Sequence, residues 1–86
     1  MKRYVKKPIA VEAMQLTNES IQNVVDWIHD TDTRAYWAGE NNIVIETLEG
    51  DMLAREGDYV IRGVRGEFYS CREDIFLETY EEFTDL

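Results

Sequence analysis

The sequence predicts an α+β fold: one curled, mostly antiparallel sheet of five to six strands, a roll or partial barrel, with its helices on one face or end. Apolar residues recur at helical spacing near residues 18–29 and again near 73–83. Between these stretches, short β-prone runs alternate with turn-forming clusters at hairpin spacing. A chain of 86 residues has room for a single domain, which we place over residues 1–86.

The first two elements are a strand and an amphipathic helix. The strand is predicted from Pro8 to Leu16, because a proline is tolerated at a strand start. Thr17 is the predicted N-cap of the helix, with Glu19 in the first turn near the positive end of the helix dipole. Leu16 and Ile21 then take the positions of a hydrophobic staple. The apolar stripe that faces the core consists of Ile21, Val24, Val25 and Ile28, with Trp27 beside it.

Five further strands and a second helix are expected after residue 33. The strands are predicted at 34–38, 43–48, 52–55, 59–62 and 67–70, and the turns between them favour antiparallel hairpins. The helix near 73–83 places Phe76, Tyr80 and Phe83 at i, i+4 and i+7. Either Ser70, at capping-box spacing from Glu73, or Arg72 caps this helix.

Composition excludes several classes of protein. The chain has 9 Lys and Arg against 18 Asp and Glu, a net charge of −9, which argues against direct nucleic-acid binding. A single cysteine excludes an internal disulfide and fits a reducing cytoplasm. No apolar run is long enough for a membrane span, and the first residues do not have the pattern of a signal peptide.

Charge is distributed unevenly along the chain. The first seven residues form a basic N-terminal arm with four positive charges, whereas the remaining 79 residues carry a net charge of −13. This distribution indicates either an ordinary solvated surface or an acidic face that mimics nucleic acid and meets a basic partner. For the second interpretation, the candidate partner-binding residues are Glu78, Glu81 and Glu82 with the aromatic side chains of Tyr80 and Trp37.

Two arginines flank a glycine-containing loop in the second half of the chain. Arg62, Gly63, Arg65 and Gly66 form a candidate ligand-binding loop, because its backbone N–H groups can face an anion such as a phosphate or carboxylate. The alternative is a tight hairpin that needs its glycines for positive φ angles, with arginines that balance nearby acids. The loop lacks the Gly-Lys-Ser/Thr ending of a phosphate-binding P-loop.

No residue is assigned a catalytic or metal-binding role, and no cofactor is expected. The single histidine, His29, and the single cysteine, Cys71, lie 42 residues apart, without the close spacing of metal ligands. His29 is explained by the dipole at the end of its helix, and Cys71 by packing at a strand end. Whether the chain is an enzyme stays open; the absence of a paired nucleophile and base favours a non-enzymatic role.

The chain resembles a family of small proteins encoded by bacteriophages and prophages. The resemblance rests on the opening 6–13, on a Gly-Asp-Tyr motif at 57–59, and on segments 47–50, 66–71, 75–76 and 79–81. The family usually has proline before its Gly-Asp-Tyr and again shortly after the cysteine, where this chain has Glu56 and Glu73. The resemblance covers most of the chain outside 30–42. It implies a phage or prophage accessory protein in the cytoplasm of a bacterial host, and no established activity or site residue.

Charge and resemblance together lead to one principal expectation. The chain is expected to be a non-enzymatic acidic binder of a host protein, such as an inhibitor of a host nuclease or defence system. One alternative is a module that binds a small anionic ligand or nucleotide through the Arg62–Gly66 loop. Another is a structural or assembly protein of the phage. Ten aromatic residues in 86 favour interfaces, so a homo-oligomer is a further alternative.

Overall fold

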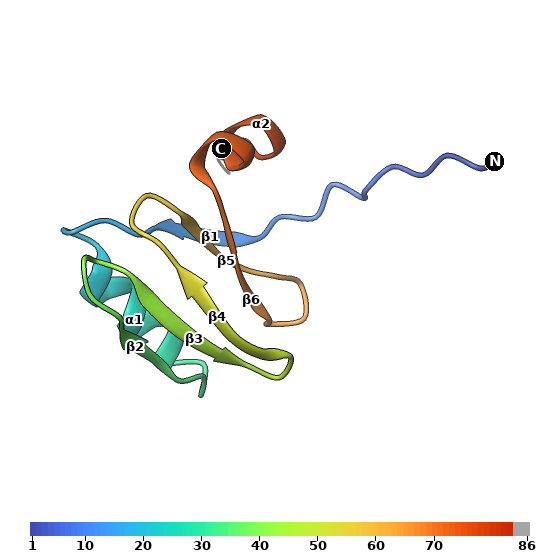
Figure 1. Cartoon of the computed structure of the whole chain (residues 1–86). Helices are drawn as coiled ribbons and strands as arrows, with labels where there is room; N and C mark the ends of the chain where they lie inside the picture. The colour runs from blue at the N-terminus through green and yellow to red at the C-terminus, as the bar shows by residue number, and fades with distance from the viewer. Residues whose placement is uncertain (84–86) are drawn as a thin grey trace.

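The computed structural model describes residues 1–83 and contains two helices and two three-stranded antiparallel sheets (Figure 1). The elements follow the order β1 (Glu12–Gln15), α1 (Ile21–His29), β2 (Ala35–Trp37), β3 (Ile43–Thr47), β4 (Gly50–Ala54), β5 (Tyr59–Arg62), β6 (Phe68–Cys71) and α2 (Glu73–Thr79). The predicted α+β class and the antiparallel pairing are therefore confirmed. Within residues 1–83, no helix has the length and apolar character to cross a membrane.

The prediction of one continuous curled sheet is wrong, because the strands divide into two sheets. Sheet A has the order β1-β5-β6, and sheet B has the order β2-β3-β4. The chain leaves sheet B after β4 at a turn whose backbone bonds to the end of β1: the N–H of Gly57 donates to the carbonyl of Leu16, and the N–H of Leu16 donates to the carbonyl of Asp58. These bonds continue the pairing of β1 with β5, so β5 does not pair with β4.

The core lies where α1 meets the inner faces of the two sheets. Val24 and Ile28 of the predicted helical stripe are fully buried, while Ile21, Val25 and Trp27 pack against the same cluster. Trp27 meets Phe68 of sheet A edge to face, with ring centroids 5.1 Å apart. The other buried members of the cluster are Leu16, Ala35, Ile43, Ile45, Ala54 and Val60. The predicted core face of the first helix is therefore confirmed.

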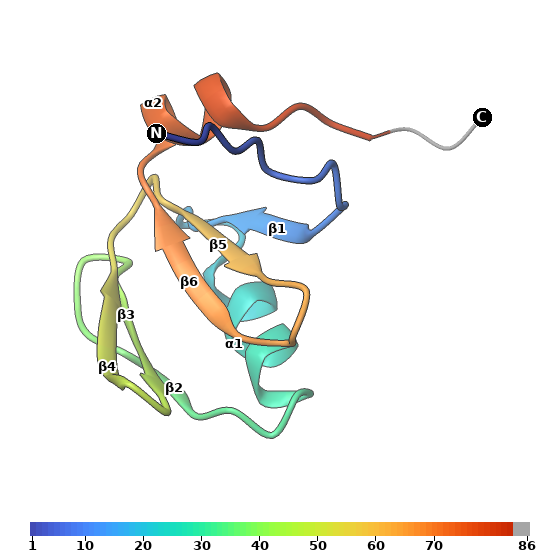
Figure 2. The ribbon, with the colours of Figure 1, turned by 90° about the vertical axis from the view of Figure 1, so that its right-hand side faces the viewer.

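The two helices lie on opposite faces of sheet A, not on one face or end as predicted (Figure 2). Val60 on β5 points toward α1, and its neighbour Tyr59 points to the other face, where its ring stacks on Phe76 of α2 with centroids 3.8 Å apart. Phe76 stacks in turn on Tyr80, at 4.8 Å. The hydroxyl groups of Tyr80 and Tyr69 lie 3.2 Å apart in a hydrogen bond. These four rings, which we call the aromatic cluster, attach α2 to sheet A.

The N-terminal elements are shorter than predicted. The predicted strand at 8–16 is paired only over Glu12–Gln15, because β5 ends at Arg62, the residue opposite Glu12. The first helix begins at Ile21 with Ser20 as N-cap, not with Thr17. Thr17 and Ser20 instead bond to each other: the N–H of each donates to the hydroxyl oxygen of the other, and the hydroxyl of Ser20 also donates to the carbonyl of Gln15. The predicted helix start is therefore wrong by three residues. Thr17 nevertheless makes cap-type bonds, because its hydroxyl oxygen accepts the N–H of Ser20 and its carbonyl accepts the N–H of Ile21. Leu16 and Ile21, the predicted staple pair, both belong to the core packing.

The C-terminal helix ends at Thr79, four residues earlier than predicted. Tyr80 has an extended backbone, with φ −126° and ψ 150°, and its ring is held in the aromatic cluster. Phe83, the third member of the predicted stripe, is exposed. The N-cap is Arg72, one of the two predicted alternatives. Its guanidinium donates two hydrogen bonds to Asp74 in the first turn, which hold the pKa of that carboxyl below its usual value.

Candidate functional site

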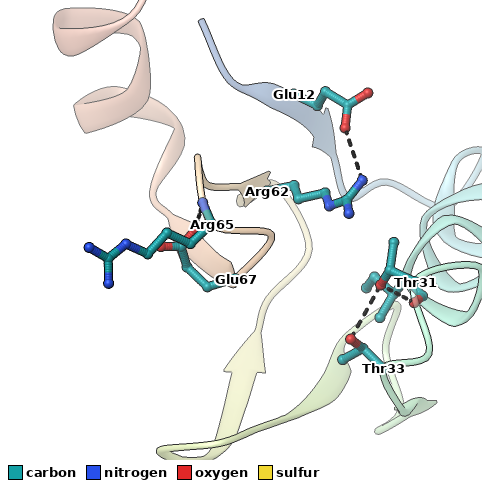
Figure 3. Close-up of polar contacts among 7 residues, drawn as sticks. Glu12, Thr31, Thr33, Arg62, Arg65 and Glu67 are labelled. Carbon is teal, nitrogen blue, oxygen red and sulfur yellow. Dashed lines mark hydrogen bonds and ion pairs between the residues drawn. The ribbon is translucent and has the colours of Figure 1, made fainter. Parts of the chain in front are cut away.

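The two arginines of the candidate loop point away from each other (Figure 3). Arg62 lies on β5 directly opposite Glu12 on β1, and its guanidinium nitrogen is 3.6 Å from the Glu12 carboxylate. The side chain of Arg65 leaves the loop on the other side. The arrangement is therefore that of a cross-strand ion pair and a solvated arginine, and the two cations do not converge on one point.

The backbone donors of this loop are already bonded within the chain. The N–H of Gly63 donates to the carbonyl of Glu67 at 2.7 Å, and the N–H of Gly66 donates to the carbonyl of Gly63 at 2.9 Å. The N–H of Arg65 donates to the side-chain carboxylate of Glu67 at 3.0 Å. Gly66 has a φ of +83°, in the left-handed region that favours glycine. The geometry favours the hairpin alternative, because the carboxylate of Glu67 stands where an anionic ligand would bind.

A cavity of about 930 Å³ lies beside the loop, between it and the far end of the β3–β4 hairpin. Arg65 and Gly66 contribute to its wall, but Arg62 does not. Two arginines and four acidic residues line it, namely Arg34, Arg65, Asp32, Glu46, Glu49 and Glu67. This excess of negative charge opposes an anionic ligand in the cavity.

The residues with reactive side chains lie apart. His29 is exposed, and its Nε2 lies 2.9 Å from the carbonyl oxygen of Ala35, the first residue of β2. Cys71 is half-buried on β6. In the part of the chain that the structure describes, no three His, Cys, Asp or Glu side chains are grouped as metal ligands.

The structure separates the candidate partner-binding residues into two groups. Glu78, Glu81 and Glu82 are exposed on α2 and just after it. Tyr80 belongs to the aromatic cluster and faces inward. Trp37 is 69% exposed at the edge strand β2 of sheet B, at the opposite end of the molecule from α2 (Figures 1 and 2). These five residues therefore do not form a single partner surface.

Sheet B presents a continuous apolar row on its outer face. Tyr36 lies opposite Val44, and Val44 lies opposite Leu53, so the three side chains cross the sheet in register. Tyr36 is 46% exposed and Leu53 is 44% exposed. The next row on the same face brings Glu46 opposite Asp51, with Arg34 3.9 Å from Glu46. We call these two rows the sheet B face. Trp37 does not belong to it, because Trp37 lies opposite the buried Ile43 and therefore on the other side of the sheet.

The sheet B face is a candidate site that the sequence pattern alone does not reveal. Its signal was the alternation along residues 34–38, 43–48 and 52–55, which places alternate apolar residues on the face away from the core. Without the register, that alternation did not show that Tyr36, Val44 and Leu53 form one row.

No family model, curated protein or solved structure matches this chain in comparisons with known proteins.

Proposed function

We propose that this chain is a non-enzymatic accessory protein of a phage or prophage that binds a basic host protein through the sheet B face. The observation that carries the proposal is the exposed row of Tyr36, Val44 and Leu53 next to carboxylates. The resemblance to phage and prophage proteins supports a target inside a bacterial host. Inhibition of a host nuclease or defence system is the role that suits such a binder.

The apolar row supplies the contact area of an interface. Aromatic side chains are enriched at the centre of protein interfaces, where they bury a large area with few rotatable bonds. Tyr36, on the edge strand β2, supplies the exposed aromatic side chain of this row. The opposite face of the same sheet is filled by the core through Ile43, Ile45 and Ala54. Packing against the core therefore holds the sheet in place, while its other face stays exposed. A pre-organised exposed face suits a docking surface.

The charge of the chain indicates the chemistry of the partner. Acidic residues outnumber basic residues 18 to 9, and Glu46 and Asp51 lie on the proposed face itself. A positively charged partner would be attracted over a distance, which raises the association rate more than the final affinity. We therefore expect a basic partner with an apolar patch, whose association rate falls as salt is added.

The test is capture from a bacterial host lysate at low and high salt, with four tagged chains compared by mass spectrometry. They are the wild type, the face variant Tyr36→Ser/Leu53→Ser, the control Val64→Ser/Leu77→Ser, and the charge variant Glu78→Lys/Glu81→Lys/Glu82→Lys. Val64 and Leu77 are exposed apolar residues outside the sheet B face, so the control removes a similar apolar surface elsewhere. Melting temperatures establish that each variant folds.

We expect a host protein bound to the wild type and the control, weakened at high salt, and lost from the face variant. Binding that survives in the face variant would contradict the proposal. If only the charge variant loses the partner, the acidic residues around α2 form the interface and the sheet B face does not.

A further inference from the structure

We propose that a groove between the N-terminal arm and α2 binds a compound that carries a carboxylate on an apolar group. The groove has a volume of about 480 Å³ and is lined by residues of the arm, of α2 and of the end of β6. Figure 1 shows the first residues extending away from the body of the molecule, and the part of the arm that lines the groove is residues 6–9. The proposal concerns a different surface from the sheet B face and does not depend on it.

The charge of the groove is opposite to that of the chain as a whole. Lys6 and Lys7 belong to its lining, and none of its lining residues within the described chain is acidic. The larger cavity beside the Arg62–Gly66 loop has four acids and two arginines in its lining. In a chain with net charge −9, two adjacent cations without an acid in the same groove are a local reversal of charge that favours an anion.

The floor of the groove is held in place by the aromatic cluster. The ring of Tyr80 stacks on Phe76, and its hydroxyl is bonded to that of Tyr69. Burial raises the pKa of Tyr69 above its ordinary value, and the hydrogen bond with Tyr80 raises it further, so the Tyr69 hydroxyl stays protonated at neutral pH. Ile75 lies one turn before Thr79 on the same side of α2, and both line the groove. A pre-formed floor reduces the ordering cost of binding.

The arm brings its cations to this floor. The ammonium of Lys6 lies 5.7 Å from the centre of the Tyr80 ring, within reach of a cation–π interaction. Pro8 fixes its own φ, and the N–H of Ile9 donates to the carbonyl of Lys7 at 2.8 Å, which bends the arm beside the two lysines. Residues 1–10 are all exposed. A ligand that pairs with Lys6 and Lys7 would therefore hold the arm against α2.

The dimensions and walls of the groove define the ligand class. Its volume falls in the range of small-molecule sites, about 300–1,000 Å³. Pro8, Ile9, Ile75 and the Tyr80 ring offer apolar contact, and the two ammonium groups suit a carboxylate. A free small acid and the C-terminus of a peptide share this chemistry.

The experiment follows backbone amide signals of the full chain by two-dimensional NMR during titration with four probes. These are 3-phenylpropionate, its neutral analogue 3-phenylpropionamide, and the peptide acetyl-Gly-Gly-Phe with a free or an amidated C-terminus. The test variant is Lys6→Gln/Lys7→Gln. The matched control is Lys2→Gln/Arg3→Gln, which removes the same charge from the same arm at residues outside the groove lining.

We expect saturable shifts at Cys71, Ile75 and Thr79 with at least one acid, and at least tenfold weaker binding of the corresponding amide. Lys6→Gln/Lys7→Gln weakens that binding about tenfold or more, and Lys2→Gln/Arg3→Gln leaves it within about twofold. The acid that binds more tightly identifies the source. The proposal is overturned if neither acid gives saturable shifts, if the amides bind equally, or if both variants weaken binding equally.

Discussion

At the scale of single residues, Glu67 determines the state of the Arg62–Gly66 loop. Its carboxylate accepts the N–H of Arg65 and fills the space above Gly63, so that a Cβ placed on Gly63 would collide with it. Two arginines next to glycines are a sequence signal for anion binding, and the structure shows that an acid of the chain itself supplies the anion. The hairpin itself therefore explains the pattern of arginines and glycines, without a bound anion.

This arrangement predicts that Gly63 and Glu67 are energetically coupled. Gly63→Ala must push the Glu67 side chain away from the Arg65 N–H, which lowers the free energy of unfolding by about 1 kcal/mol. In a Glu67→Ala background the collision is absent, so the same glycine substitution costs much less. Urea denaturation of both single variants and the double variant measures the coupling. Additive single-variant effects would show that the carboxylate does not occupy this position.

At the scale of elements, the pair of Tyr69 and Tyr80 joins β6 to the end of α2. Tyr69→Phe removes this hydrogen bond, and we expect it to lower the free energy of unfolding at neutral pH by about 1 kcal/mol. Because the folded state raises the pKa of Tyr69, its contribution is complete below the unfolded pKa of about 10 and is lost as pH rises through the folded pKa.

The stability difference between wild type and Tyr69→Phe should therefore be constant near neutral pH and narrow above about pH 10. Chemical denaturation at a series of pH values measures it, with Tyr4→Phe as control, since Tyr4 is 86% exposed on the arm. A difference that stays constant into the alkaline range would contradict the raised pKa.

Local sequence patterns predicted the individual helices and strands, but they did not predict which strands pair with each other. The stripe of the first helix and the limits of β5 at 59 and 62 were predicted correctly, because periodicity and turn residues are local signals. The carboxylate of Asp58, in the turn before β5, accepts the N–H of Arg55 at 2.9 Å, which is a local bond typical of aspartate in turns. The bonds from this turn to Leu16 span some forty residues, so no local pattern indicates that β5 pairs with β1.

The early end of α2 has a similar origin. Phe76, Tyr80 and Phe83 have helical spacing, but Tyr80 gains more from stacking and from its bond to Tyr69 than from another helical turn. Tertiary contacts override propensity in a helix this short. The sheet B face also arises from pairing between strands, so no local pattern indicates that Tyr36 and Leu53 share one surface.

At the scale of the whole molecule, the two sheets differ in how many of their faces are covered by other elements. Sheet A is covered on both faces, by α1 on one and by α2 with the aromatic cluster on the other. Sheet B uses one face for the core and exposes the other. The residues outside the arm carry a net charge of −13, so the exposed face of sheet B belongs to an acidic part of the molecule. The arm, in contrast, is positively charged. Binding at the two surfaces is expected to select ligands of opposite charge.

This charge distribution predicts how stability depends on salt. Mutual repulsion in a chain of net charge −9 destabilises the compact state, and salt screens it: the Debye length falls from about 30 Å at 0.01 M to about 10 Å at 0.1 M. The melting temperature of the wild type should therefore rise over this range. Replacing Lys2, Arg3, Lys6 and Lys7 by Gln takes the net charge to −13 and should make the rise steeper, with a lower melting temperature at low salt.

The opposite change provides the matched control. Glu78→Gln/Glu81→Gln/Glu82→Gln brings the net charge to −6 without altering the core, because the three side chains are exposed, and the salt-dependent rise should become smaller. Differential scanning calorimetry of the three chains from 0.01 to 0.1 M salt orders them by slope, with the arm variant steepest and the glutamate variant shallowest. Equal slopes would mean that repulsion is already relieved by local ion pairs such as Arg62 with Glu12 and Arg72 with Asp74. The arm would then have no measurable part in balancing the acidic body.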